Sequence, residues 1–440
     1  MEKIQNLRGV VELLKAHGAL KTIHDPVSPE YEAASIVHRY DGKAVLFDNI
    51  KGSDIDVIAG IGSCRDYYAH ALGIRKDQLL HTLADAFLSD EAPPVADVAP
   101  CKENISKNPD LGKLPIFTHF KGDGGPYITS GVAIVRDPDL GQNMCFHRLM
   151  RTGKDTLCAR IVENRGTHNA LKKADGVLDV AICIGAPLHV LLAAACSPPP
   201  GHDEALIAQG LAPTPMAKAE TSGLMVPALS EIVIEGTFTG EYDQEGPFVD
   251  LTQTPDVVRS QPVIKVKAIT TRNHPIYHAL MPSSLEHKLL MGMPKEPSIY
   301  NAARSVADVK NVLITPGGCS WLHAVLQIDP KGKDDAMMAA RKAFEGHGSL
   351  KHCMVVDTDI DIYDSQDLEW ALATRVQASR DCTILQDMPG SSLDPSASHA
   401  QGRKSETDKM IIDATIPYGE PRGEYAKVSF EPLGDDVREG

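Results

Sequence analysis

The sequence predicts a multidomain α+β protein in which two α/β domains, residues 1–107 and 296–440, flank a β-rich domain at residues 108–295. Three observations support this prediction. The chain has 440 residues, 42% of them hydrophobic, which is more than one ordinary core needs. Helical and strand-like patterns alternate in the first and last thirds. The middle third contains mainly short strands with tight turns, a pattern typical of a small sheet or barrel.

The N-terminal segment has the clearest helical pattern. Apolar residues recur at helical spacing at Leu7, Val10, Val11 and Leu14, and Gly18 follows as a helix end, so we expect a helix at residues 7–17. The same reasoning predicts helices at 29–40 and 65–72 and strands at 44–50 and 55–62. The polar, proline-rich residues 89–115 predict a linker.

The middle segment predicts a β-meander. Strands are expected at residues 127–137, 143–150, 156–162, 178–185, 230–239 and 262–272. Two helices, at residues 188–196 and 203–211, interrupt them. We therefore expect one barrel with a helical insertion.

The last third returns to α/β alternation. Strands are expected at residues 311–318, 320–328, 351–357 and 381–387, with helices at 334–348 and 365–375. Residues 389–409 are polar and small, which predicts a loop lying over a neighbouring element or a partly mobile segment.

Composition and charge narrow the class of protein. The formal net charge of -15 and the pI near 5.6 argue against nucleic acid or an anionic membrane as a partner. The nine cysteines are odd in number and contain no CxxC pair, so reduced thiols are expected. The first residues lack the apolar core of a signal peptide, and no apolar run reaches membrane-spanning length. We expect a cytoplasmic enzyme or binding protein.

Two acidic or histidine-rich stretches look like metal sites but lack necessary residues. The stretch "DTDIDIYD" has the alternating acids of a calcium loop, but Ile362 replaces the glycine of the turn and Leu368 replaces the closing glutamate. The stretch "HPIYH" spaces two histidines like a zinc pair, but Pro275 disfavours the helix on which such a pair stands. We interpret its histidines as residues at a strand end.

The stretch "EGPFVD" places Glu245 and Asp250 around a bend. Gly246 supplies backbone freedom and Pro247 prevents a regular helix or central strand, so the segment could turn both acids toward one cavity. Upstream, the segment that starts at Asn143 is rich in arginine, with Arg148, Arg160 and Arg165. By composition alone, a solvated strand face with surface ion pairs explains these residues best.

Those two segments resemble the signature of the UbiD family of prenylated-flavin-dependent decarboxylases. The likeness extends over almost the whole chain and includes "LRGVVELLKAHGALKTI", "AVLFDNIKG", "VPALSEIVIEG", "ITTRNHPIYHALMP", "TPGGCSWLHAVLQI" and "DLEWALATR", in this order. The resemblance implies the UbiD fold, in which a central split β-barrel of the flavin-reductase type holds the cofactor and the C-terminal domain makes oligomer contacts. It also implies a carboxy-lyase that forms a homodimer or a larger homo-oligomer.

The resemblance implies a role for each matching residue. Arg148, Glu245 and Asp250 would be the catalytic trio, with Asp250 as the proton donor and Glu245 kept ionised by Arg148. Asn143 and Glu204 would bind Mn²⁺ or Mg²⁺ beside the flavin phosphate, with K⁺ as a further ion and His168 as a weaker ligand candidate, since Gly166 stands where some members have histidine. The residues expected to contact the cofactor are Phe146, His147, Arg148, Arg160, Ile161, Val162, Arg165, Gly166 and Lys351.

The chemistry of the residues agrees with these roles. Carbonyl, carboxylate and phosphate oxygens suit a hard divalent ion, and no side chain provides the electron sink that decarboxylation requires, so a cofactor must supply it. Many members have glutamate in place of Asp250 and glycine in place of Val249, which makes the donor shorter and its neighbour larger here.

Within the family, "FHRLMRTGKD" and "SLEHKLLMGMP" look most like the archaeal branch that decarboxylates trans-anhydromevalonate 5-phosphate to isopentenyl phosphate. This implies a phosphorylated unsaturated acid as substrate and a flavin prenyltransferase as cofactor supplier. Arg151, Lys154 and Arg272 are candidates for a second anion site. Three alternatives remain open: a decarboxylase of an aromatic or heteroaromatic acid such as 4-hydroxybenzoate, an ordinary flavin oxidoreductase, and a non-catalytic binding subunit.

Overall fold

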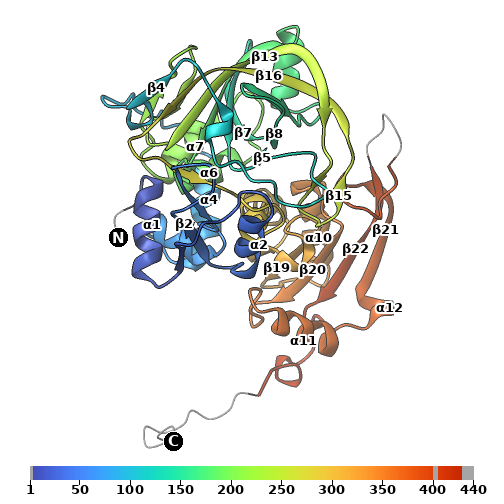
Figure 1. The fold of residues 1–440 in the computed structure, drawn as a ribbon. Helices are drawn as coiled ribbons and strands as arrows, with labels where there is room; N and C mark the ends of the chain where they lie inside the picture. Colours follow the sequence, from blue (N-terminus) through green and yellow to red (C-terminus); the bar gives the residue numbers. More distant parts are fainter. Residues whose placement is uncertain (1–2, 400–404, 429–440) are drawn as a thin grey trace, which may run out of the picture.

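The computed structural model describes residues 3–399 and 405–428, and its strands form three principal sheets (Figure 1). The first sheet has the order β1-β2-β3-β17 and is covered by helices from the start of the chain. Its elements are α1 (Leu7–Ala16), β1 (Leu20–Ile23), α2 (Glu32–Arg39), β2 (Ala44–Phe47), β3 (Asp56–Ala59), α3 (Arg65–Ala71) and α4 (Leu79–Ala86). The fourth strand, β17 (Ile276–His278), comes from far along the chain and pairs in parallel with β3.

The second sheet has nine strands, and eight of them follow the order β5-β8-β9-β16-β13-β10-β6-β7, with β4 paired to β16. Its strands are β4 (Asn104–Ser106), β5 (Tyr127–Ile128), β6 (Val132–Asp137), β7 (Gly141–Phe146), β8 (Leu149–Arg151), β9 (Thr156–Ala159), β10 (Val177–Ile184), β13 (Ile232–Glu245) and β16 (Arg259–Thr271). Helices α5 (Gly166–Lys173), α6 (Leu188–Ala194) and α7 (Glu204–Leu211) and the hairpin β11 (Met216–Lys218) and β12 (Met225–Pro227) lie within this part of the chain.

Strands β13 and β16 are long and curved (Figure 1). Their antiparallel register shifts between Glu235 and Gly236 and again between Phe238 and Tyr242. Such bulges bend a strand and increase its twist. The far end of the pair therefore leaves the sheet and carries Glu245 to the small ladder of β14 (Phe248–Val249) and β15 (Pro255–Asp256).

The third sheet has the mixed order β18-β19-β20-β22-β21. Helices α8 (Leu285–Gly292) and α9 (Glu296–Ala303) lead into β18 (Val309–Ile314), β19 (His323–Ile328), α10 (Asp335–Gly346), β20 (His352–Asp357), α11 (Ser365–Arg375), α12 (Ala378–Asp381), β21 (Cys382–Pro389) and β22 (Glu406–Ala414). Buried Val, Ile, Leu and Ala side chains form two cores that each include residues of the first two sheets, and two further cores on the third sheet.

The alternating elements of both ends and the two inserted helices are confirmed as predicted. The prediction for residues 389–409 was wrong at its end, because Glu406 begins β22; residues 400–404 lie outside the described part of the chain. Lys409 concealed this strand, since a lysine is not expected at a buried position. It is 1% exposed, its ammonium donates to the Gly348 carbonyl at 2.7 Å, and it lies over the Phe344 ring.

Other elements were absent from the prediction. Helices α4, α5, α8 and α9 were not anticipated. In α8 and α9 the breakers Gly292, Pro294 and Pro297 interrupt the helical pattern, but Pro297 stands in the first turn of α9, where proline is tolerated. The predicted linker contains β4, which pairs with β16.

The two stretches rejected as metal sites have other partners. Asp357 and Asp359 of "DTDIDIYD" both pair with Arg375. In "HPIYH", His278 lies in β17 and donates to or accepts from Glu286 at 3.0 Å, while His274 has a positive φ of 48° just before the strand. No helix among the described residues is long and apolar enough to cross a membrane.

Candidate active site

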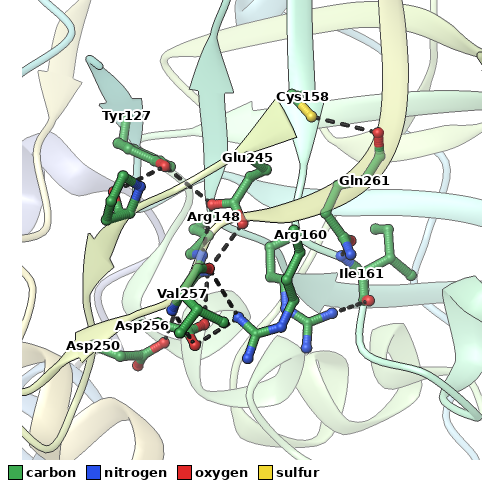
Figure 2. Close-up of polar contacts among 12 residues, drawn as sticks. Tyr127, Arg148, Cys158, Arg160, Ile161, Glu245, Asp250, Asp256, Val257 and Gln261 are labelled. Atoms are coloured by element: carbon green, nitrogen blue, oxygen red, sulfur yellow. Dashed lines mark hydrogen bonds and ion pairs between the residues drawn. The ribbon is translucent and has the colours of Figure 1, made fainter. Parts of the chain in front are cut away.

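Arg148 lies at the centre of a cluster of three carboxylates (Figure 2). Its Nε and Nη2 donate to the two oxygens of Glu245, each at 2.9 Å, in a two-pronged contact. Nη1 donates to Asp250 at 3.0 Å, and Nη2 also donates to Asp256 at 2.8 Å. The guanidinium therefore uses four of its five N–H groups, and one on Nη1 is free of these contacts.

The turn after β13 brings the acids to this arginine. Glu245 is the last residue of β13, and Gly246 follows with a φ of 100°, which a residue with a side chain rarely adopts. A Cβ on neighbouring Gly124 would lie 2.1 Å from the Gly246 carbonyl oxygen, so the two backbones need this close approach. The bend predicted from Gly246 and Pro247 is confirmed.

Burial and aromatic contacts hold Arg148 and Glu245 in place. The Glu245 side chain is fully buried, and the Tyr127 hydroxyl donates to its Oε1 at 3.1 Å. The Arg148 guanidinium lies over the Phe248 ring at 4.8 Å. Burial would lower the pKa of Arg148, but the hydrogen bonds and charge of Glu245 outweigh it and raise that pKa. Arg148 is thus a fixed cation.

Asp256 and Tyr127 belong to this cluster, although the sequence did not single them out. Asp256 lies six residues after Asp250, beyond the turn, and only its β14–β15 pairing returns it to Arg148. Tyr127 reaches Glu245 from β5, more than a hundred residues earlier in the chain. No short-range spacing connects these residues, which explains why they were missed.

Arg160 and Ile161, two of the predicted cofactor-contacting residues, follow β9 beside Arg148 (Figure 2). The Arg160 backbone N–H donates to the Arg148 carbonyl at 3.1 Å, and the Ile161 N–H donates to Gln261 Oε1 at 2.7 Å. Val162, the next residue, is 48% exposed. Figure 2 shows Arg160 and Ile161 next to the Arg148 cluster.

Phe146 is the last residue of β7, and His147 follows it. His147 Nε2 lies 2.9 Å from Thr167 Oγ1 and 3.2 Å from Cys145 Sγ, and burial lowers its pKa to about 4. A neutral imidazole is therefore expected near pH 7. Phe146 is partly buried against the main core.

Glu204, one of the two proposed metal ligands, contacts the backbone beside Asn143, the other. Glu204 begins α7, where Asp203 caps the helix by accepting from the Ala205 N–H at 2.8 Å. Glu204 Oε2 accepts from the Met144 N–H at 2.8 Å, one residue beyond Asn143. A Cβ on Gly166 would lie 2.5 Å from Asn143 Oδ1, so a side chain at this position would require Asn143 to shift.

The electrostatics of Glu204 suit a bound cation. Glu204 is 6% exposed, and burial raises its pKa to about 8. Among the described residues it has no ion-pair partner, whereas buried carboxylates normally have one. Two oxygen ligands fit a hard divalent ion whose other ligands come from a phosphate and water. No group of three His, Cys, Asp or Glu side chains in the described chain could hold a metal by itself.

Lys351, the predicted phosphate contact, and Lys295 have different surroundings in the structure. Lys351 donates to Ser396 Oγ and pairs with Asp394 at 2.8 Å, so its charge is already neutralised. Lys295, which was not predicted, donates to Ser197 Oγ and has no carboxylate partner among the described residues. Burial and, less strongly, Arg165 lower its pKa to about 8, while Glu204 opposes this. Lys295 thus shares one electrostatic neighbourhood with Glu204 and Arg165.

The remaining predicted residues are more scattered. His168 Nδ1 accepts from the Asn164 N–H at 3.3 Å. Arg151 and Lys154 line a cavity of about 420 Å³ beside Gly112 and Pro126. Arg272 pairs with Glu231 at 3.2 Å instead, so these three cations do not form one anion site.

Comparison with known proteins shows the family. Family models for the N-terminal, Rift-related and C-terminal domains of 3-octaprenyl-4-hydroxybenzoate carboxy-lyase match residues 11–87, 94–285 and 288–414. The chain belongs to the UbiD family. This UbiD-family protein is therefore a carboxy-lyase by descent, and its mixed α/β multidomain fold is the fold of that family.

Archaeal relatives are similar over nearly the full length. The anhydromevalonate phosphate decarboxylase of Methanosarcina mazei is 43% identical, covering 93% of this chain and 95% of the relative. The enzyme of the same name from Methanocaldococcus jannaschii is 39% identical, covering 92% and 97%.

Solved UbiD-class structures are similar to this chain in fold over nearly its full length. HmfF from Pelotomaculum thermopropionicum in complex with FMN has a TM-score of 0.93 at 38% identity and covers 98% of this chain and 99% of its own. An apo 3,4-dihydroxybenzoic acid decarboxylase from Enterobacter cloacae has a TM-score of 0.90 at 27% identity, with 98% of each chain covered.

Proposed function

We propose that this UbiD-family protein decarboxylates trans-anhydromevalonate 5-phosphate to isopentenyl phosphate with prenylated FMN as cofactor. The observation that carries the proposal is the Arg148–Glu245–Asp250 cluster, which an ordinary flavin oxidoreductase would not need. The archaeal relatives with this activity in their names support the choice of substrate.

The cofactor is proposed to lie on the central domain, a split barrel of the flavin-reductase type, beside Phe146, His147, Arg160, Ile161, Val162, Arg165 and Gly166. Asn143 and Glu204 would hold Mn²⁺ or Mg²⁺ against its phosphate, with K⁺ as a further ion and His168 as a secondary ligand candidate. Lys295 is a better phosphate cation than Lys351, because Lys351 would first have to leave Asp394. HmfF in complex with FMN or prFMN supports this assignment.

The protein's own residues then perform three tasks. When bound, prenylated FMN supplies the electron sink for the charge left by departing CO₂. Arg148 has one N–H on Nη1 free to bind the substrate carboxylate, and Glu245 fixes its orientation through two bonds. Asp250, at the edge of the cluster, delivers a proton to the carbon that lost CO₂.

The partners of the reaction follow from the same proposal. A flavin prenyltransferase would supply the cofactor, and the protein would act in the cytoplasm as a homodimer or a larger homo-oligomer. A solved form of HmfF is dimeric, which supports self-association. The division into domains at residues 107 and 295 belongs to this proposal as well.

A second candidate is an aromatic acid. It is favoured by the similarity to 3,4-dihydroxybenzoic acid and vanillic acid decarboxylases, at 25–28% identity. The reconstituted protein should be incubated with trans-anhydromevalonate 5-phosphate, its dephosphorylated form and a cinnamate-type acid. We expect the phosphorylated acid to react about a hundredfold faster than the dephosphorylated one, because remote binding energy orients the reacting alkene. Preference for the aromatic acid would overturn the isoprenoid assignment but not the decarboxylase activity.

A further inference from the structure

We propose that Asp256 is a positioning residue that holds Arg148 in place together with Glu245, so that Asp250 can leave the arginine and return during proton delivery. This inference rests on the proposed function for the roles of Arg148 and Asp250. It assigns Asp256 a part that the catalytic trio does not include.

The contacts of Arg148 divide into two groups. Nε and Nη2 are occupied by Glu245 and Asp256, which together accept three N–H bonds of 2.8–2.9 Å. Nη1 alone donates a hydrogen bond to Asp250. If Asp250 moves away, three of the four bonds remain, and they fix both the plane and the rotation of the guanidinium.

Asp256 is itself held more firmly than Asp250. Its position in β15 pairs it directly with Phe248 of β14, the ring on which Arg148 stacks. Asp256 Oδ1 accepts from the Val257 N–H at 2.9 Å and pairs with Arg259 at 2.5 Å. Asp250 lies in the turn after β14, and besides Arg148 its side chain accepts, within the described part of the chain, only from the Leu251 N–H, at 2.7 Å.

The charge of Asp256 also excludes it as the proton donor. Burial would raise its pKa, but Arg259 and Arg148 outweigh burial and hold that pKa below its ordinary value. An acid bound by two guanidinium groups stays ionised near neutral pH. It can therefore anchor Arg148 but cannot donate a proton.

Crystal structures of Asp250→Ala and Asp256→Ala test the anchoring without any turnover. Arg148 should keep its position in Asp250→Ala and should lose it, or occupy several positions, in Asp256→Ala. Asp155→Ala is the matched control, since it removes a carboxylate that pairs with Lys265 of β16 at 2.7 Å and has no contact with Arg148 among the described residues. The reverse pattern, with Arg148 displaced only in Asp250→Ala, would overturn the inference.

Kinetics of the loaded enzyme then separate positioning from simple stability. Asp256→Ala should lower kcat about 10- to 100-fold, which corresponds to the free energy of one charge-assisted hydrogen bond, and should change KM less. Asp256→Asn should have a smaller kcat loss than Asp256→Ala, because asparagine keeps a hydrogen-bond acceptor. In an Arg148→Lys background, Asp256→Ala should cost nothing further, because its effect passes through Arg148.

The controls decide the remaining cases. The positioning role would be refuted if the kcat losses of Arg148→Lys and Asp256→Ala multiplied in the double variant. A kcat loss in Asp155→Ala equal to that in Asp256→Ala would also refute it. If Asp256→Ala does not fold, the comparison of Asp256→Asn with Asp250→Asn in crystals gives the same decision. If no substrate is turned over at all, the proposed function fails while the crystallographic result still tests the anchor.

Discussion

Replacing Arg148 with lysine keeps the positive charge but removes the planar guanidinium, so this substitution tests whether the proposed site needs the geometry of arginine. In the structure the guanidinium makes four charge-assisted bonds to three carboxylates from inside a pocket where its side chain is 8% exposed. A lysine ammonium is a single point and cannot span Glu245, Asp250 and Asp256 together.

The expected loss follows from the number of bonds. If two of the four bonds are lost, at about 1.5–3 kcal/mol each, the cost is about 3–6 kcal/mol, or roughly 10²- to 10⁴-fold in kcat/KM. CO₂ release should be measured on protein co-expressed with a flavin prenyltransferase, at equal flavin occupancy. Arg304→Lys, at the exposed C-cap of α9, is the matched control. An Arg148→Lys enzyme within about threefold of wild type would remove Arg148 from the mechanism.

Three further predictions concern the metal, the phosphate and acid stability. Glu204→Gln should lose most of its Mn²⁺ and flavin together, measured by elemental analysis and absorbance, because the ion joins protein to phosphate; full retention of both would contradict the site. Lys295→Met should weaken FMN binding about 10- to 100-fold in a fluorescence titration, whereas Lys351→Met should change it less than threefold; equal losses would favour Lys351. Burial lowers the pKa of His189 to about 3 from an ordinary value of 6.5, so the folded state binds this proton less readily. The stability that this neutral histidine contributes is therefore present above pH 6.5 and is lost as pH falls toward 3, by at most about 1.4 kcal/mol per pH unit. Chemical denaturation between pH 7 and 5 should show a shallower pH slope for His189→Asn, and an unchanged slope would refute the assignment.

Local signals predicted the parts of the site that depend on local geometry. Gly246 and Pro247 indicated the bend, and the bend does bring Glu245 and Asp250 to Arg148. Gly166 was predicted to contact the cofactor and to stand where some family members have histidine, and in the structure a Cβ at this position would lie 2.5 Å from Asn143 Oδ1. The chemical roles of these residues remain predictions.

Residues that depend on long-range pairing could not be predicted in the same way. Asp256 reaches Arg148 through the β14–β15 ladder, and the charge of Lys295, in the short turn between α8 and α9, interacts with that of Glu204. In β22, Lys409 broke the expected alternation of apolar and polar residues because its ammonium is satisfied inside the protein. In each case an interaction between residues far apart in the chain determines a position that the local sequence pattern does not predict.

The position of β17 has a consequence for how the chain is synthesised. The first sheet is complete only when residues 276–278 join β3, and Glu286 then accepts from the Gly60 and Gly62 N–H groups at 2.8 and 3.0 Å. A nascent chain that has emerged only to residue 107 therefore leaves one edge of β3 unpaired, and such edges attract other strands. The ribosome must release about 170 further residues before that edge is covered. The N-terminal region should thus need protection from aggregation during translation, and it should not be stable as an isolated fragment.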